Sequence, residues 1–262
     1  MREYISSETI TFYDDKFWFT GINNNNVYVY DFNVNKCFHF CTIDDEQQNG
    51  KRLFGTIIVR NGYLYLFPFS ATQIYKIDIE SREIKGIPLE RPDKSIHGRY
   101  CPEAKFLSSH CYEDEIWILP ASYPAILEYR IKDERIIYHK EWTNEIFEFI
   151  NDKNENAFFR KTEMVENKLY APLCGGNAVL IYDVSDNSYD IRQVGDKGCS
   201  YSSVCYDGEY FWLIPRGNSA IVKWETKSNR YSLNNVFPTD LKREKGIFND
   251  VVCFEGHIII LP

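Results

Sequence analysis

The chain has 262 residues, of which 44% are hydrophobic and 16% aromatic, and its net charge is −8. This charge argues against a nucleic-acid or membrane-surface binder, since both need a basic face. No stretch approaches the roughly 18 apolar residues of a membrane span, and the first residues lack the apolar region of a signal peptide, so we expect a cytoplasmic protein.

A short turn followed by an apolar strand recurs six times along the chain. The turn signals are of the Asn-Gly or Asp-Gly kind, which tolerate positive φ and make tight hairpins. Five of the strands reach a proline, and a glycine, Gly21, stands in the sixth. The six stretches are DDKFWFTG from Asp14, NGYLYLFP from Asn61, EDEIWILP from Glu113, ENKLYAPL from Glu166, DGEYFWLIP from Asp207 and EGHIIILP from Glu255.

Each of these stretches is the centre of a longer repeat. An apolar strand precedes the turn, and an alternating strand follows the proline and closes on a polar residue such as Asp31, Asp78 or Asp183, where we expect side-chain bonding within the turn. A fourth strand then completes the unit. We name the four strands a, b, c and d. Turn starts are spaced by 47, 52, 53, 41 and 48 residues.

Four short strands at this period predict an all-β protein, a β-propeller of four-stranded antiparallel blades. A β-sandwich is the alternative, but it has no need of a proline that recurs in register. We expect one domain, with five complete blades and the first two strands of a sixth. The blades are placed at about 1–45, 51–92, 99–143, 155–195 and 198–237, with a half blade at 245–262.

The repeat resembles the blades of NHL, YVTN and Kelch-type propellers over essentially the whole chain. The resemblance is architectural and implies the fold without a function. The paired glycines of Kelch blades and the Gly-His and Trp-Asp pairs of WD40 blades are absent. Because the sixth blade would lack strands c and d, we also expect a C-terminally incomplete protein.

Three cysteines, Cys111, Cys205 and Cys253, stand two residues before a turn, where other blades carry Phe, Val or Met. We therefore expect inert core thiols. The string Cys37-Phe-His39-Phe-Cys41 places three metal-type ligands on one face of a strand, about 6.6 Å apart, which is too far for one zinc ion. No metal site and no cofactor are expected.

One stretch between the third and fourth blades has helical spacing. Residues 141–158 carry Trp142, Ile146, Phe147 and Phe149, which fit one or two helical turns with Thr143 or Asn144 as the N-cap.

The b–c and d–a loops emerge on one face of a propeller, which is where we expect a ligand. Arginines there could pair with a carboxylate or phosphate, and aromatic rings supply flat apolar area. We predict a non-catalytic propeller that binds a small anionic or sugar-like ligand, or a protein partner. Two alternatives stay open: a lactonase, lyase or glycoside-active enzyme at the mouth of the central channel, and a structural scaffold. The candidate residues are Arg99, Arg160, Tyr201, Arg216, Asn218 and Asn249.

Overall fold

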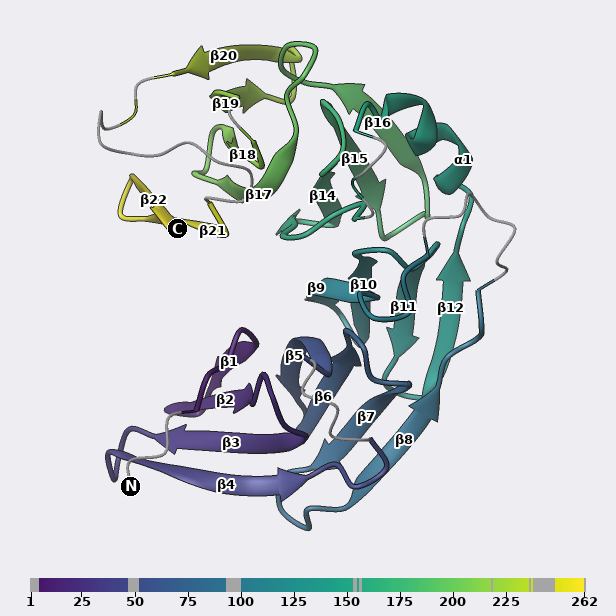
Figure 1. Ribbon diagram of the computed structural model, residues 1–262, viewed down its shortest axis with the longest axis vertical. Coiled ribbons are helices and arrows are strands. Elements are labelled where there is room, and N and C mark those ends of the chain that lie inside the picture. The colour runs from purple at the N-terminus through teal and green to yellow at the C-terminus, as the bar shows by residue number, and fades with distance from the viewer. Residues whose placement is uncertain are drawn as a thin grey trace. The chain divides into compact units, whose positions relative to one another are not determined.

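The computed structural model describes residues 5–46, 52–92, 100–152, 155, 157–217, 219–235, 237 and 248–261. The chain divides into two compact units, Met1–Ser109 and His110–Pro262. The described residues form five four-stranded antiparallel sheets and one two-stranded sheet, each with its strands in chain order (Figure 1). The all-β fold and the four-stranded antiparallel blades are therefore confirmed. The single domain stays a prediction.

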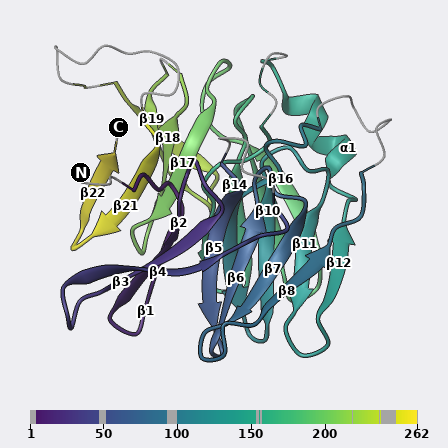
Figure 2. The same ribbon diagram turned by 60° about the horizontal axis from the view of Figure 1, so that its bottom comes forward.

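The first unit holds two blades. Blade 1 is made of β1 (Ile10–Tyr13), β2 (Lys16–Thr20), β3 (Asn26–Asp31) and β4 (Lys36–Thr42). Blade 2 is made of β5 (Phe54–Arg60), β6 (Tyr63–Pro68), β7 (Gln73–Asp78) and β8 (Ile84–Pro88). Figure 2 shows β5, β6, β7 and β8 running side by side.

The next sheets follow the same order. Blade 3 has β9 (Phe106–Tyr112), whose first residues belong to the first unit, with β10 (Glu115–Pro120), β11 (Ile126–Arg130) and β12 (Arg135–His139). Blade 4 has β13 (Glu163–Val165), β14 (Lys168–Pro172), β15 (Ala178–Asp183) and β16 (Tyr189–Gln193). Blade 5 has β17 (Tyr201–Tyr206), β18 (Phe211–Pro215), β19 (Ile221–Glu225) and β20 (Arg230–Asn234). The half blade has β21 (Asp250–Phe254) and β22 (His257–Leu261).

The turns form as their residues require. Asn61 and Gly62 adopt φ values of 51° and 76°, so Arg60 pairs directly with Tyr63 across the a–b hairpin. At the c–d turn, Asp78 accepts backbone N–H bonds from Glu80 and Ser81 at 2.9 and 2.8 Å. These bonds lower the pKa of the Asp78 carboxyl. The acidic residues that close strand c therefore bond within the turn, as predicted.

The core of each unit lies between successive blades. In the first unit, Trp18 and Val27 of blade 1 pack with Ile57, Leu66 and Tyr75 of blade 2. Facing sides of blades 3 and 4, and of blades 4 and 5, make two further apolar clusters in the second unit. Apolar residues on alternate strand positions thus pack one sheet against the next.

A short helix follows blade 3, as predicted. Helix α1 (Thr143–Ile146) continues into the 3-10 turn η1 (Phe147–Phe149), and Trp142 and Ile146 are fully buried. The predicted N-cap is wrong, because Trp142 holds that position without a side-chain cap bond. The Thr143 hydroxyl instead donates to the Lys140 carbonyl at 2.6 Å. The indole of Trp142 donates to the His139 carbonyl, which ties the helix to blade 3.

Of the three cysteines predicted to be core thiols, one is buried. Cys205 is buried, whereas Cys253 is half-buried and Cys111 is exposed. Cys111 is therefore a correction, because it is exposed and does not belong to the core. No helix among the described residues is long and apolar enough to cross a membrane.

Candidate functional site

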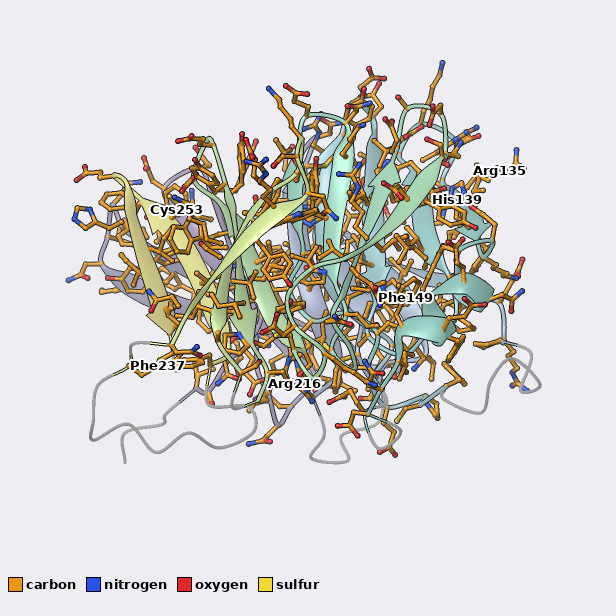
Figure 3. The ribbon with its side chains drawn as sticks, turned by 90° about the horizontal axis from the view of Figure 1, so that it is seen from above. Arg135, His139, Phe149, Arg216, Phe237 and Cys253 are labelled. Atoms are coloured by element: carbon orange, nitrogen blue, oxygen red, sulfur yellow. The ribbon has the colours of Figure 1, made fainter. Side chains whose placement is uncertain are left out.

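The b–c and d–a loops of the second unit are joined by backbone hydrogen bonds. Because strands alternate in direction, both kinds of loop lie at the same edge of each sheet. Figure 3 shows Arg216 and Phe237 toward this edge and Arg135 and Cys253 toward the opposite one. We call it the loop edge. The bonds run from Phe158 N to Ala121 O (2.5 Å), Cys174 N to Phe158 O (2.8 Å), Tyr201 N to Leu173 O (3.1 Å) and Arg216 N to Ser200 O (2.9 Å).

Arg216 lies at the loop edge but is already paired. Its guanidinium Nε donates to the Glu155 carboxylate, and the two side chains are only 14% and 7% exposed. Glu155 also accepts the backbone N–H of Ala157 at 3.0 Å. The ion pair therefore joins the b–c loop of blade 5 to the connection between blades 3 and 4, and it neutralises one of the predicted cations.

Arg160 differs from Arg216 in this respect. It is half-buried and makes no hydrogen bond or ion pair within the part of the chain that the structure describes. Its backbone neighbours are held on both sides: Phe159 N donates to Pro120 O and Lys161 N donates to Ser202 O, both at 3.3 Å. The backbone around Arg160 is thus held in place, while the guanidinium N–H groups have no acceptor among the described residues.

Lys161, next in sequence, reaches the half blade. Its ammonium pairs with the Asp250 carboxylate and donates to the Val251 carbonyl at 2.8 Å. The two side chains are 35% and 45% exposed, so solvent screens the pair. The pair connects the start of β13 with the start of β21.

Two further titratable groups lie on the inner strands nearby. His110 on β9 bonds to the Thr162 hydroxyl at 2.8 Å. Burial, and then the Lys161 charge, lower the pKa of His110 to about 4, so its imidazole is neutral at pH 7. Burial raises the pKa of the Glu163 carboxyl, and the Lys161 charge opposes this. We call His110, Lys161, Thr162, Glu163 and Asp250 the inner-strand cluster.

Tyr201 lies in the core and not at the surface. It has no exposed area, and its hydroxyl donates to the Val194 carbonyl. Burial raises the pKa of this phenol well above its ordinary value. Tyr201 therefore fixes the connection between blades 4 and 5, and it offers no surface to a ligand.

Three predicted site residues remain: Arg99, Asn218 and Asn249. Arg99 and Asn218 lie outside the described residues. Asn249 is exposed, and its backbone N–H donates to the Leu261 carbonyl at 3.0 Å. Of the six residues predicted from the sequence, Arg160, Arg216 and Asn249 are thus described near the loop edge with some exposed surface.

Within the described ranges, no three His, Cys, Asp or Glu side chains are arranged so that they could hold a metal ion. In the Cys37-Phe-His39-Phe-Cys41 string, the His39 imidazole bonds to the Thr42 hydroxyl at 3.0 Å. The register of β3 and β4 shifts between Val27 and Tyr28. These contacts give His39 a structural partner within its own strand.

Sequence reasoning missed the partners of these residues. Neither Glu155 nor His110 is among the site residues predicted from the sequence. The repeat itself carries a usable signal: β9 and β13 are inner strands of successive blades, so His110 and Thr162 near their ends can meet. No such signal exists for Glu155, which lies outside every strand.

Known structures of similar fold include a streptogramin B lyase, with a TM-score of 0.62 and 15% identity over 88% of this chain and 69% of that one. Two structures of an extracellular domain from B. thetaiotaomicron, described as part of a hybrid two component or one component system, give TM-scores of 0.60 and 0.63. They are 13% and 10% identical over 90% and 96% of this chain, which spans only 28% and 31% of theirs. No family model and no curated protein matches. The similarity confirms the β-propeller fold and, at this identity, the fold alone. The Kelch type is not confirmed.

Proposed function

We propose that this chain is a non-catalytic propeller that binds a small anionic ligand at the loop edge of its second unit, with Arg160 as the charged contact. One observation carries the proposal: within the described residues, Arg160 is the loop-edge arginine whose guanidinium has no partner, whereas Arg216 is paired with Glu155. A guanidinium binds carboxylate or phosphate through two parallel hydrogen bonds.

The surroundings of Arg160 support this assignment. The backbone bonds of Phe159 and Lys161 hold the segment on both sides, so little ordering is needed when a ligand binds. Exposed Asn249 lies in the connection that leads to β21 and adds a neutral donor and acceptor at the same edge. A carboxylate or phosphate on a small, sugar-like body fits this combination of one open cation and neutral polar groups.

A thermal-shift screen of small carboxylates, phosphates and neutral sugars tests the proposal. We expect at least one anion to raise the melting temperature of the wild type, and Arg160→Ala to lose most of that shift. Arg135→Ala is the matched control, because Arg135 is exposed at the opposite edge. An equal loss in the two variants, or a response to neutral sugars alone, contradicts an anion site at Arg160.

The inner-strand cluster favours a second function, an enzyme that uses acid–base chemistry. His110 is neutral at pH 7, and the raised pKa of Glu163 moves its carboxyl toward a proton donor. Groups of this kind suit proton abstraction or elimination. That a streptogramin B lyase shares the fold makes the test worthwhile, although a common fold is no evidence of a common reaction.

The two functions are separable by experiment. Anions found in the screen are incubated with the protein, and product formation is followed by NMR. Conversion by the wild type that His110→Gln abolishes, with binding retained, supports the enzyme. Binding without conversion at any pH from about 5 to 9, a range that brackets the useful pKa values of general bases, supports the binding protein.

A further inference from the structure

Two cysteines face each other between blade 5 and the half blade. On β17, Val204 and Tyr206 point into the cluster shared with blade 4. Cys205 occupies the alternate side of the strand and belongs to the cluster that includes Val251 of β21. Since neighbouring side chains of a strand point to opposite faces, Cys205 points from β17 toward β21.

The same argument orients Cys253. On β21, Val252 and Phe254 are exposed, whereas Val251 is buried and Cys253 packs against the cluster that contains Cys205. Cys253 therefore points from β21 toward β17. After burial, Cys253 is the largest influence on the Cys205 thiol, whose pKa is raised to about 12. Both observations place the two cysteine side chains in one apolar layer between β17 and β21.

We propose that Cys205 and Cys253 form a reversible disulfide, which joins the inner strand of blade 5 to the half blade. A disulfide needs Cβ atoms that point at one another from backbones about 4.4–6.8 Å apart between Cα atoms. Two inner strands that pack side by side through these residues satisfy the requirement of facing side chains.

The differing burial of the two thiols suggests the order of the chemistry. Cys253 is half-buried and lies toward the edge opposite the loop edge, whereas Cys205 is buried. Hydrogen peroxide is the oxidant. The Cys253 sulfur attacks one peroxide oxygen, the O–O bond breaks, and the second oxygen leaves as water, which gives a sulfenic acid. The Cys205 sulfur then attacks the Cys253 sulfur, and its oxygen leaves as a second water with the Cys205 proton. Two thiols and one peroxide thus give one disulfide and two waters.

The link would restrain the β21–β22 hairpin. The bonded residues are 253 − 205 = 48 positions apart, so the bond closes a long loop in the unfolded chain. In the folded chain it fixes β21, whose Asp250 pairs with Lys161 of the inner-strand cluster. Oxidation is therefore expected to raise the melting temperature and to slow amide exchange in β21 and β22.

The test is treatment of the purified full chain with hydrogen peroxide, followed by alkylation of remaining thiols, intact-mass measurement and non-reducing peptide mapping. We expect the monomer to lose two hydrogen atoms and to yield one peptide pair that joins Cys205 to Cys253. Reduction should restore both thiols and reverse the rise in melting temperature.

Cys253→Ser is the diagnostic variant, since its partly exposed position tolerates a hydroxyl, and it should lose the linked pair. Cys111→Ser is the control, because Cys111 is exposed and stands at the same place before its turn, and it should keep the pair. The proposal is overturned if Cys205 stays free under oxidation, if Cys253 links to another cysteine, or if the rise in melting temperature on oxidation persists in Cys253→Ser.

Discussion

The loop edges of the two units each contain a buried carboxylate, but the two carboxylates have different partners. In the first unit, Glu46 accepts bonds from the Thr72 amide and hydroxyl at 2.6 and 2.8 Å and from the Tyr75 hydroxyl at 3.1 Å. In the second unit, Glu155 pairs with the Arg216 guanidinium. The first carboxylate accepts these bonds from neutral donors, whereas the second also pairs with a cation.

A second pair of residues shows what the units share. Asn25 of blade 1 and Asn177 of blade 4 each stand one residue before strand c. Each donates from its side chain to a carbonyl after strand d, Ile43 at 2.8 Å and Gly195 at 3.0 Å. The repeat thus reuses one bond to close the loop edge, while the charged contacts are particular to each blade. We therefore expect the charged side chains of each loop edge, and not the shared asparagine bond, to determine which ligand it binds.

The largest predicted effect comes from Glu155→Gln. Leaving Arg216 as a mostly buried charge without its partner is expected to cost about 3 kcal/mol of unfolding free energy, measured by urea denaturation. Glu46→Gln is the matched variant in the first unit. It keeps an acceptor oxygen for neutral donors, so a cost of about 1 kcal/mol is expected. An equal loss of unfolding free energy in the two variants would contradict the idea that the partners of the two carboxylates differ in their effect on stability.

Asn177→Ala and Asn25→Ala are expected to have matching effects. Each leaves a carbonyl without its side-chain donor in a buried place, at a cost of about 1–2 kcal/mol. The same denaturation experiment measures both. A cost confined to one unit would show that the shared bond stabilises the two loop edges differently.

The inner-strand cluster predicts a pH dependence. The pKa of His110 is about 4 in the folded chain, against 6.5 for an ordinary histidine. The unfolded state therefore binds more protons between these values, and the folded state loses stability as pH falls from about 6.5 toward 4. His110→Gln should flatten this slope by about 1 kcal/mol in total after allowance for partial solvent exposure. Glu163 titrates nearby with the opposite sign, because its pKa is raised, so the difference between wild type and variant is the quantity to measure.

Arg160→Ala is expected to change stability least. Its guanidinium has no partner among the described residues, so the cost should stay within about 0.5 kcal/mol. A much larger loss would mean that Arg160 is a structural residue, and it would remove the basis for a ligand contact there.

The fold could be predicted because each repeat carries the residue pattern of four strands and their turns. Alternation, turn residues such as Asn61-Gly62 and the proline position specify each blade locally. The candidate site depends instead on side chains that meet across blades. That Arg216 would pair with Glu155, 61 residues away, follows from how the loops fold back. The sequence places Tyr201 in a d–a loop on the expected ligand-binding face, whereas its ring is buried in the cluster between blades 4 and 5.

The most direct test of the account is amide hydrogen exchange of the wild type with and without the anion that gives the largest thermal shift. We predict slower exchange at the loop edge of the second unit, in residues 157–161 and around Asn249, with unchanged exchange in the c–d turns at the opposite edge, such as the turn before Arg135. Protection confined to the c–d turns, or to the first unit, would contradict the account.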